Sequence, residues 1–158
     1  MEEKATSLAK NALLYDEFIL REIEAGRITP EMFSDDEMEI FLHGHCHQKS
    51  LVGIEKTQRV LSSLLQGAKV NVIPSSCCGM AGSFGYEKEH YQKSVSIGEM
   101  VLFPAVRKAV REHKEADGAP LFVLAPGTSC RQQILDGTGV KAHHPLEILL
   151  KYCTIESF

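Results

Sequence analysis

The sequence has no excess of basic residues and no long apolar run, and these two absences exclude several classes of protein. Its 158 residues include 17 Lys and Arg against 21 Asp and Glu, a formal net charge of −4. Proteins that bind nucleic acid neutralise phosphates with Lys and Arg, so nucleic acid is not an expected partner. No apolar stretch approaches the ~20 residues that a membrane-spanning helix needs.

The amino end also lacks a secretory signal, because MEEKATSLAK is charged and polar rather than basic and then apolar. The five cysteines are an odd number, and nothing indicates the extracellular setting of a disulfide framework. With 44% hydrophobic and 24% charged residues, the composition is that of an ordinary globular domain. These features predict a cytoplasmic protein, with a peripheral position on the cytoplasmic face of the inner membrane as the alternative.

Short apolar runs alternate with longer amphipathic stretches along most of the chain. The runs predict strands at residues 39–43, 69–73, 121–125 and 140–143. Helical spacing of apolar residues predicts helices at residues 7–27, 49–66, 87–113, 129–136 and 145–152, and Pro104 starts a new helix or kinks the third. The alternation predicts a Rossmann-like α/β fold, with a mostly parallel sheet of about four strands and helices on both faces.

The same pattern divides the chain into two parts. Residues 1–38 are predicted to form an N-terminal helix and an acidic linker, and residues 39–158 a cysteine-rich α/β domain. Within the second part, four cysteines directly follow the first three predicted strands: Cys46, Cys77, Cys78 and Cys130. Parallel strands point their carboxyl ends at one edge of a sheet, where open α/β proteins bind ligands, so the four thiols are expected to meet there. Cys153 lies in an apolar run and is interpreted as a small buried hydrophobe.

Clustered thiols outside a disulfide framework indicate metal or redox chemistry. Thiolates on loops that lead into helices are stabilised by free backbone N–H groups, and they are the usual ligands of iron–sulfur clusters and zinc. The loop from Gly79 to Gly85 fits this chemistry, because glycine lets the backbone approach a bulky inorganic group. The loop residues predicted to bind the cofactor are Gly79, Gly82 and Ser83.

Nearby histidines and one arginine are further candidates. His45 and His47 flank Cys46 and are interpreted as additional or supporting ligands, whereas His43 is interpreted as packed inside the fold. Arg131 follows Cys130, where it offsets the negative charge of a thiolate group or lies in solvent as an ordinary helix residue.

The residues leave other interpretations open. Four cysteines with neighbouring histidines also suit a structural zinc site in an interaction domain. The adjacent Cys77 and Cys78 suit a thiol–disulfide redox protein, or a strained disulfide between the two. Cys46 and His47 could pair as a nucleophile and its base.

Four segments together resemble the cysteine-rich CCG domain family: GHCHQKSL, SSCCGMAGSFGYEKEHY, TSCRQQI and HHPLEILL. This family includes one of the heterodisulfide reductase subunits, the iron–sulfur subunits of glycolate oxidase and of anaerobic glycerol-3-phosphate dehydrogenase, and FAD-linked D-lactate dehydrogenases, whose C-terminal region is most similar. The family pattern is Cys, then Cys-Cys-Gly, then Cys-x-x-Cys. Gly127 stands where many members have the first Cys of the last pair, so four ligand cysteines remain here.

The resemblance implies a 4Fe-4S electron-transfer domain of an oxidoreductase that oxidises a 2-hydroxy acid, D-lactate above all. It implies cluster ligation by the four clustered cysteines, with FAD bound only in a domain absent from this chain. Flavin and ferredoxin-like domains of the same parent protein would be its partners, and the electron acceptor is not specified. The chain resembles a C-terminal fragment, so it is expected to be inactive by itself.

Overall fold

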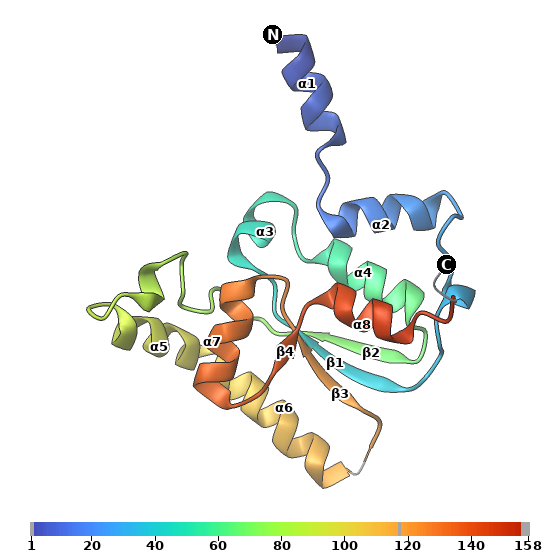
Figure 1. Ribbon diagram of the computed structural model, residues 1–158. Helices are drawn as coiled ribbons and strands as arrows, with labels where there is room; N and C mark the ends of the chain where they lie inside the picture. The colour runs from blue at the N-terminus through green and yellow to red at the C-terminus, as the bar shows by residue number, and fades with distance from the viewer. Residues whose placement is uncertain (1, 117, 156–158) are drawn as a thin grey trace.

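The structure, a computed structural model, describes residues 2–116 and 118–155. Within these residues, four parallel strands form one sheet in the order β2-β1-β3-β4. The strands are β1 (Met38–Leu42), β2 (Ala68–Val72), β3 (Leu121–Leu124) and β4 (Ala142–His143). Helices surround the sheet (Figure 1), which confirms the predicted α/β fold class. The strand bounds differ from the predicted ones by at most two residues.

Two apolar cores, one on each face of the sheet, hold the helices in place. The helices are α1 (Glu2–Asn11), α2 (Tyr15–Glu24), α3 (Cys46–Leu51), α4 (Glu55–Leu64), α5 (Tyr91–Met100), α6 (Leu102–Ala116), α7 (Thr128–Thr138) and α8 (Pro145–Tyr152). Side chains of α2, α4 and α8 build one core, and side chains of α6 and α7 build the other. Alternate residues of a strand point to opposite faces, so β1 gives Ile40 to the first core and Phe41 to the second.

The prediction of one continuous helix over residues 7–27 is wrong, because the chain leaves the helical conformation at residues 12–14. Leu14 is extended (φ −68°, ψ 158°), and its N–H donates to the Glu17 carboxylate at 3.0 Å. This contact satisfies one backbone N–H at the start of α2, which begins as a separate helix. Helix α1 buries no side chain and projects away from the body of the protein (Figure 1).

The helices predicted over residues 49–66 and 87–113 are also each divided in two. Val52 and Gly53 both donate their N–H to the Gln48 carbonyl, and Gly53 has φ +80°, so α3 ends before α4 begins. Val101 (φ −143°, ψ −48°) separates α5 from α6. Pro104 lies in the first turn of α6, where its missing N–H costs no hydrogen bond, so it starts a new helix rather than kinking one.

The segment predicted as an acidic linker contains the 3₁₀ helix η1 (Pro30–Met32) and contacts the end of α8. Phe33 forms an isolated antiparallel bridge with Cys153, and the Ser34 N–H donates to the Tyr152 carbonyl at 2.8 Å. Cys153 is therefore half-buried at the end of α8, which corrects its interpretation as a buried core residue. No described helix has both the length and the apolar character needed to cross a membrane.

The second core depends on Phe103, whose ring fills space that two glycines leave open. Phe103 is fully buried, and a Cβ on Gly137 would lie 2.4 Å from the ring. We expect Phe103→Ala to lower the free energy of unfolding by about 3–5 kcal/mol, because it removes a buried ring and leaves a cavity. Urea unfolding followed by circular dichroism measures the loss. Leu8→Ala on the projecting α1 is the control, with an expected change below about 0.5 kcal/mol; equal losses would contradict the assignment of the core.

Candidate metal and thiol site

The structure brings the four clustered cysteines to one end of the sheet, although they follow three different strands. Cys46 begins α3 after β1, Cys77 and Cys78 lie in the loop after β2, and Cys130 lies in the first turn of α7 after β3. Because the three strands are parallel and level at their carboxyl ends, all three connections leave from the same edge. The four cysteines therefore lie at the edge of the sheet where the sequence predicts them.

Three of the donor atoms form a compact buried group, the inner trio of His43, Cys78 and Cys130. One imidazole nitrogen and the two sulfurs all lie within 4.8 Å of one another. Each of the three residues is at most 3% exposed. The His43 Nδ1 atom shares a 2.7 Å hydrogen bond with the Ser75 hydroxyl, whereas Nε2 is buried with no hydrogen-bond partner. A buried nitrogen without a partner is costly, and a bound metal ion would offset that cost.

Cys46 and Cys77 form an outer pair that water reaches more easily. Cys46 is exposed and Cys77 is partly exposed. Burial raises the pKa of the Cys77 thiol, and interactions with the Cys78 and Cys46 thiols raise it further. The N–H of Gly79 opposes this shift, because it donates to the Cys77 sulfur at 3.3 Å. The two pairs of thiols are thus adjacent but differ in burial.

Electrostatics favour one anionic sulfur at the centre of the inner trio. The neighbouring Cys130 thiol lowers the pKa of Cys78, and the nearby His43 ring and Met80 backbone N–H act in the same direction against burial. The same contact with Cys78, together with burial, raises the pKa of Cys130. Cys78 is therefore the more acidic of the two thiols, and a metal ion bound by both would displace the Cys130 proton.

The loop after Cys78 follows a path that only glycine allows at its first position. Gly79 has φ +102°, and a Cβ there would lie 2.1 Å from the Ser94 carbonyl oxygen. This residue places its N–H against the Cys77 sulfur, which is the kind of contact predicted for a cofactor loop. Gly82 (φ +69°) and Ser83 lie farther along and are exposed, and no described hydrogen bond joins either residue to the thiols.

His45 occupies the space beside Gly127. A Cβ on Gly127 would lie 2.5 Å from Cδ2 of the His45 ring and 2.9 Å from the Cys130 sulfur. Burial lowers the pKa of His45, so its ring is neutral near pH 7 and has a nitrogen lone pair available for a ligand. His47 is exposed, with its ring centre 6.4 Å from that of His45. His45 thus lies next to the thiols, and His47 lies outside the thiol group.

Arg131 is held by the loop between β3 and α7. Its guanidinium donates to the carbonyls of Ala125 and Pro126, each at 2.9 Å, and to the Thr128 hydroxyl at 3.3 Å. The side chain is therefore not the freely solvated residue of the alternative interpretation. Its described hydrogen bonds fix the loop that leads to Cys130, and none of them reaches a sulfur.

His43 is the site residue that sequence reasoning underrated. The interpretation that it is packed inside the fold agrees with its burial, but it overlooks where the ring points. The alternation of β1 contains the missing signal: His43 stands two residues after Phe41 and therefore faces the core that contains Cys78 and Cys130.

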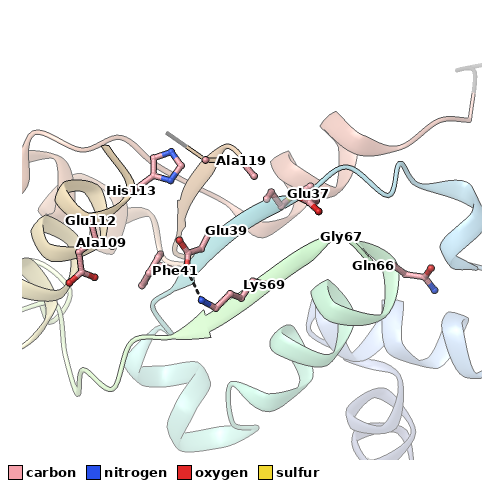
Figure 2. A pocket seen from close by; sticks show the side chains of 12 residues that line it. Glu37, Glu39, Phe41, Gln66, Gly67, Lys69, Ala109, Glu112, His113 and Ala119 are labelled. Carbon is pink, nitrogen blue, oxygen red and sulfur yellow. Dashed lines mark ion pairs between the residues drawn. The ribbon is translucent and has the colours of Figure 1, made fainter. Parts of the chain in front are cut away.

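A hollow elsewhere on the protein has a different character. It has a volume of about 640 Å³ and lies over β1 and β2 beside α6, with Glu39, Lys69, Glu112 and His113 in its lining (Figure 2). Glu39 forms an ion pair with Lys69 at 3.3 Å and accepts a hydrogen bond from Asn71 at 3.1 Å. These groups satisfy one another on a face open to solvent, and none of the clustered cysteines lines the hollow.

The fold and the site define a thiol-rich α/β domain, and similar segments occur in oxidoreductases. The chain is 29% identical over 143 residues to D-2-hydroxyglutarate dehydrogenase of Escherichia coli K12, covering 89% of this chain and 13% of that protein. It is 29% identical over 132 residues to one of the subunits of anaerobic glycerol-3-phosphate dehydrogenase from the same strain, covering 84% of this chain and 30% of that subunit. D-2-hydroxyglutarate dehydrogenase of Pseudomonas putida KT2440 is 33% identical over 111 residues, covering 70% of this chain and 10% of that protein.

The chain therefore spans a third or less of the length of these relatives. No protein-family model matches it, and no solved structure matches it. The match to anaerobic glycerol-3-phosphate dehydrogenase agrees with the resemblance inferred from the sequence motifs. Together the relatives associate this domain with oxidoreductases.

The difference in burial predicts an order of reaction for the thiols of the metal-free, folded protein. We expect iodoacetamide at pH 7.5 to modify Cys46 at least about tenfold faster than Cys130, because Cys46 is exposed and Cys130 is buried with a raised pKa. Mass spectrometry of peptides after timed quenching measures both rates. In concentrated urea the difference should disappear. Equal rates in the folded protein would contradict the described burial of Cys130.

Proposed function

We propose that the chain is a metal-binding electron-transfer domain of an oxidoreductase, with an iron–sulfur cluster as its cofactor. The observation that carries the proposal is the buried group of Cys78, Cys130 and the unpartnered His43 Nε2 atom, at the edge of the sheet where Cys46 and Cys77 also lie. The similarity to oxidoreductases and to a subunit of one supports the same proposal.

The residues present fit such a group in three respects. Sulfur ligands are what iron–sulfur clusters require, and Cys46, Cys77, Cys78 and Cys130 would supply them. The lowered pKa of Cys78 provides one thiolate before any metal binds. The N–H of Gly79 already points at a sulfur, as is common around clusters. When bound, a cluster would supply one-electron transfer; the protein residues would hold it, exclude water and set its potential through N–H contacts.

A single zinc ion is the second candidate, and His43 is the observation that favours it. Zinc prefers four ligands drawn from thiolate and imidazole. The inner trio supplies one nitrogen and two sulfurs, and the outer pair or His45 would complete the four. The third interpretation, thiol–disulfide exchange at Cys77 and Cys78, gains no support, because an attacking thiol needs both a lowered pKa and access to a partner. Cys78 has the lowered pKa but is buried, and Cys77 is partly exposed but has a raised pKa.

The substrate would be bound and oxidised by another part of an intact oxidoreductase. We propose that a flavin domain of the same parent protein oxidises a 2-hydroxy acid and that electrons pass through this domain to an acceptor. D-lactate, inferred from the motifs, and D-2-hydroxyglutarate, which the names of two relatives give, are both 2-hydroxy acids. No side chain of the site is assigned to proton abstraction from the substrate, so this chain alone should have no dehydrogenase activity.

Metal and sulfide analysis tests the cofactor directly. Protein purified without oxygen should be brown and contain roughly two or more irons per chain together with acid-labile sulfide. Atomic emission spectroscopy and a colorimetric sulfide assay measure both. Stoichiometric zinc without sulfide would replace the first candidate with the second. Metal-free protein with one rapidly alkylated thiol would contradict both metal proposals and favour thiol–disulfide chemistry.

Ligation predicts that single cysteines differ in their importance. Cys78→Ser should abolish metal retention, because it removes the thiolate at the centre of the inner trio. Cys153→Ser is the matched control; it changes the same atom at the far end of α8 and should retain metal fully. Metal content after gel filtration measures retention, and circular dichroism confirms folding. Equal retention by the two variants would exclude Cys78 as a ligand.

A further inference from the structure

Helix α3, which begins with Cys46, is held to the body of the protein by polar anchors rather than by apolar packing. Gln48 is its one buried side chain, and its apolar residue Leu51 is 67% exposed. A helix of six residues has almost no stability of its own, because the cost of starting a helix is not recovered over so few hydrogen bonds. The position of Cys46 therefore depends on whatever holds α3.

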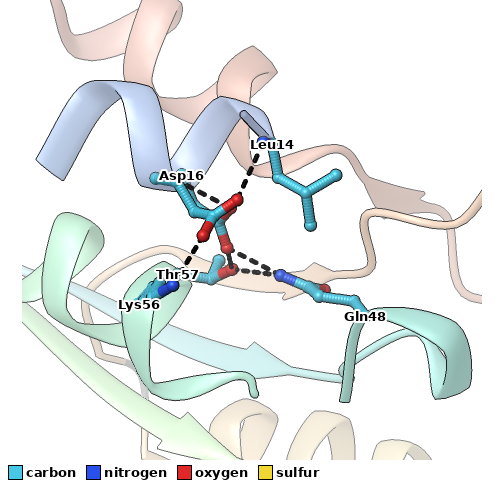
Figure 3. Close-up of polar contacts among 6 residues, drawn as sticks. Leu14, Asp16, Gln48, Lys56 and Thr57 are labelled. Carbon is cyan, nitrogen blue, oxygen red and sulfur yellow. Dashed lines mark hydrogen bonds and ion pairs between the residues drawn. The ribbon is translucent and has the colours of Figure 1, made fainter. Parts of the chain in front are cut away.

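The first anchor is a buried carboxylate on the preceding helix, α2 (Figure 3). Asp16 is fully buried, and its Oδ2 atom accepts hydrogen bonds from Gln48 Nε2 at 2.7 Å and from the Thr57 hydroxyl at 2.6 Å. Gln48 Nε2 also donates to the Thr57 oxygen at 2.7 Å, which closes a three-residue network across α2, α3 and α4. A buried carboxylate is stable only when such donors surround it, so the network strongly favours the docked position of α3.

The second anchor joins α3 to the loop of the adjacent cysteines. The Lys49 ammonium donates to the carbonyls of Ser75 and Ser76, at 2.5 Å and 2.7 Å, immediately before Cys77. Glycines bound the helix on both sides: Gly44 precedes it, and Gly53 follows it with φ +80°. The short helix is thus fixed on one side to α2 and α4 and on the other to the loop before Cys77.

We propose that α3 is a gate that controls access to the metal site, and that the hydrogen bond between Asp16 and Gln48 holds it closed. The inner trio, whose three residues are at most 3% exposed, is joined to α3 through Ser75, which bonds both Lys49 of α3 and His43. An ion can reach them, or leave them, when α3 swings outward with Cys46. Cys46 is then the ligand that binds last and detaches first, and Asp16 is a positioning residue that acts through Gln48. The inference rests on the proposed metal site.

The rate of zinc release tests whether the contact between Asp16 and Gln48 holds α3 closed. The probe is Zn²⁺ bound to the reduced protein and captured by 4-(2-pyridylazo)resorcinol, whose absorbance reports release. Asp16→Ala should accelerate release by about tenfold or more, since it removes the charged acceptor of two hydrogen bonds. Leu20→Ala is the matched control; it loosens the packing of the same helix α2 without touching α3. Equal acceleration by both variants would contradict the proposed role of the contact between Asp16 and Gln48.

An exchange of partners tests the specific contact. Gln48→Glu places a second carboxylate against Asp16 and should release α3 from its closed position, which would accelerate zinc release. Adding Asp16→Asn to that variant recreates a donor and an acceptor at the same two positions, with the amide now on residue 16. Release should return to within about threefold of the starting protein, because the hydrogen bond is restored. Failure of the double variant to slow release while it remains folded would overturn the inference.

Hydrogen exchange separates this inference from the proposed function, because it needs no metal. In the metal-free protein, Asp16→Ala should increase amide exchange in residues 46–53 at least about tenfold and leave residues 60–64 of α4 unchanged. Unchanged amide exchange in residues 46–53 would contradict the proposal that Asp16 holds α3 closed, even if zinc binds. A starting protein that binds neither zinc nor iron would overturn the metal site, and the exchange result would still decide whether α3 opens.

Discussion

The parallel pairing of β1 with both of its neighbours is the constraint on which the site depends. Leu42, the last residue of β1, lies opposite Val72 of β2 and Leu124 of β3, so the three strands end level with one another. Their connections therefore leave from one edge, and a few residues suffice to carry each cysteine to the same place. An antiparallel neighbour would have sent its connection to the opposite edge of the sheet.

Burial decides which chemistry suits the inner trio. Cys78 and Cys130 belong to the same apolar core as Phe103 and Ile134, and His43 is buried beside them. A thiolate and an imidazole nitrogen without a partner are expensive in such surroundings, and metal coordination is a common way to offset the cost. The same surroundings would slow water from reaching a cofactor, which suits the electron-transfer role proposed for this site.

The two halves of the site are held by different forces. Core packing fixes the inner trio, whereas hydrogen bonds to Asp16 and to two loop carbonyls fix α3 with Cys46. The N-terminal part of the chain therefore bears on the site, although it contains no cysteine. Leu20 of α2 also joins the core built on α4 and α8, so this helix is packed against the sheet domain.

The sequence by itself determined the fold class, because apolar runs of strand length separated by amphipathic stretches leave few arrangements other than a covered parallel sheet. It also determined which edge would gather Cys46, Cys77, Cys78 and Cys130, since that follows from strand direction alone. It did not reveal the breaks before α2 and α4, which arise from local capping at Leu14 and a left-handed glycine. Only the tertiary structure decided that His43 points at two sulfurs and that Asp16 anchors α3, because both depend on how strands and helices distant in sequence pack together.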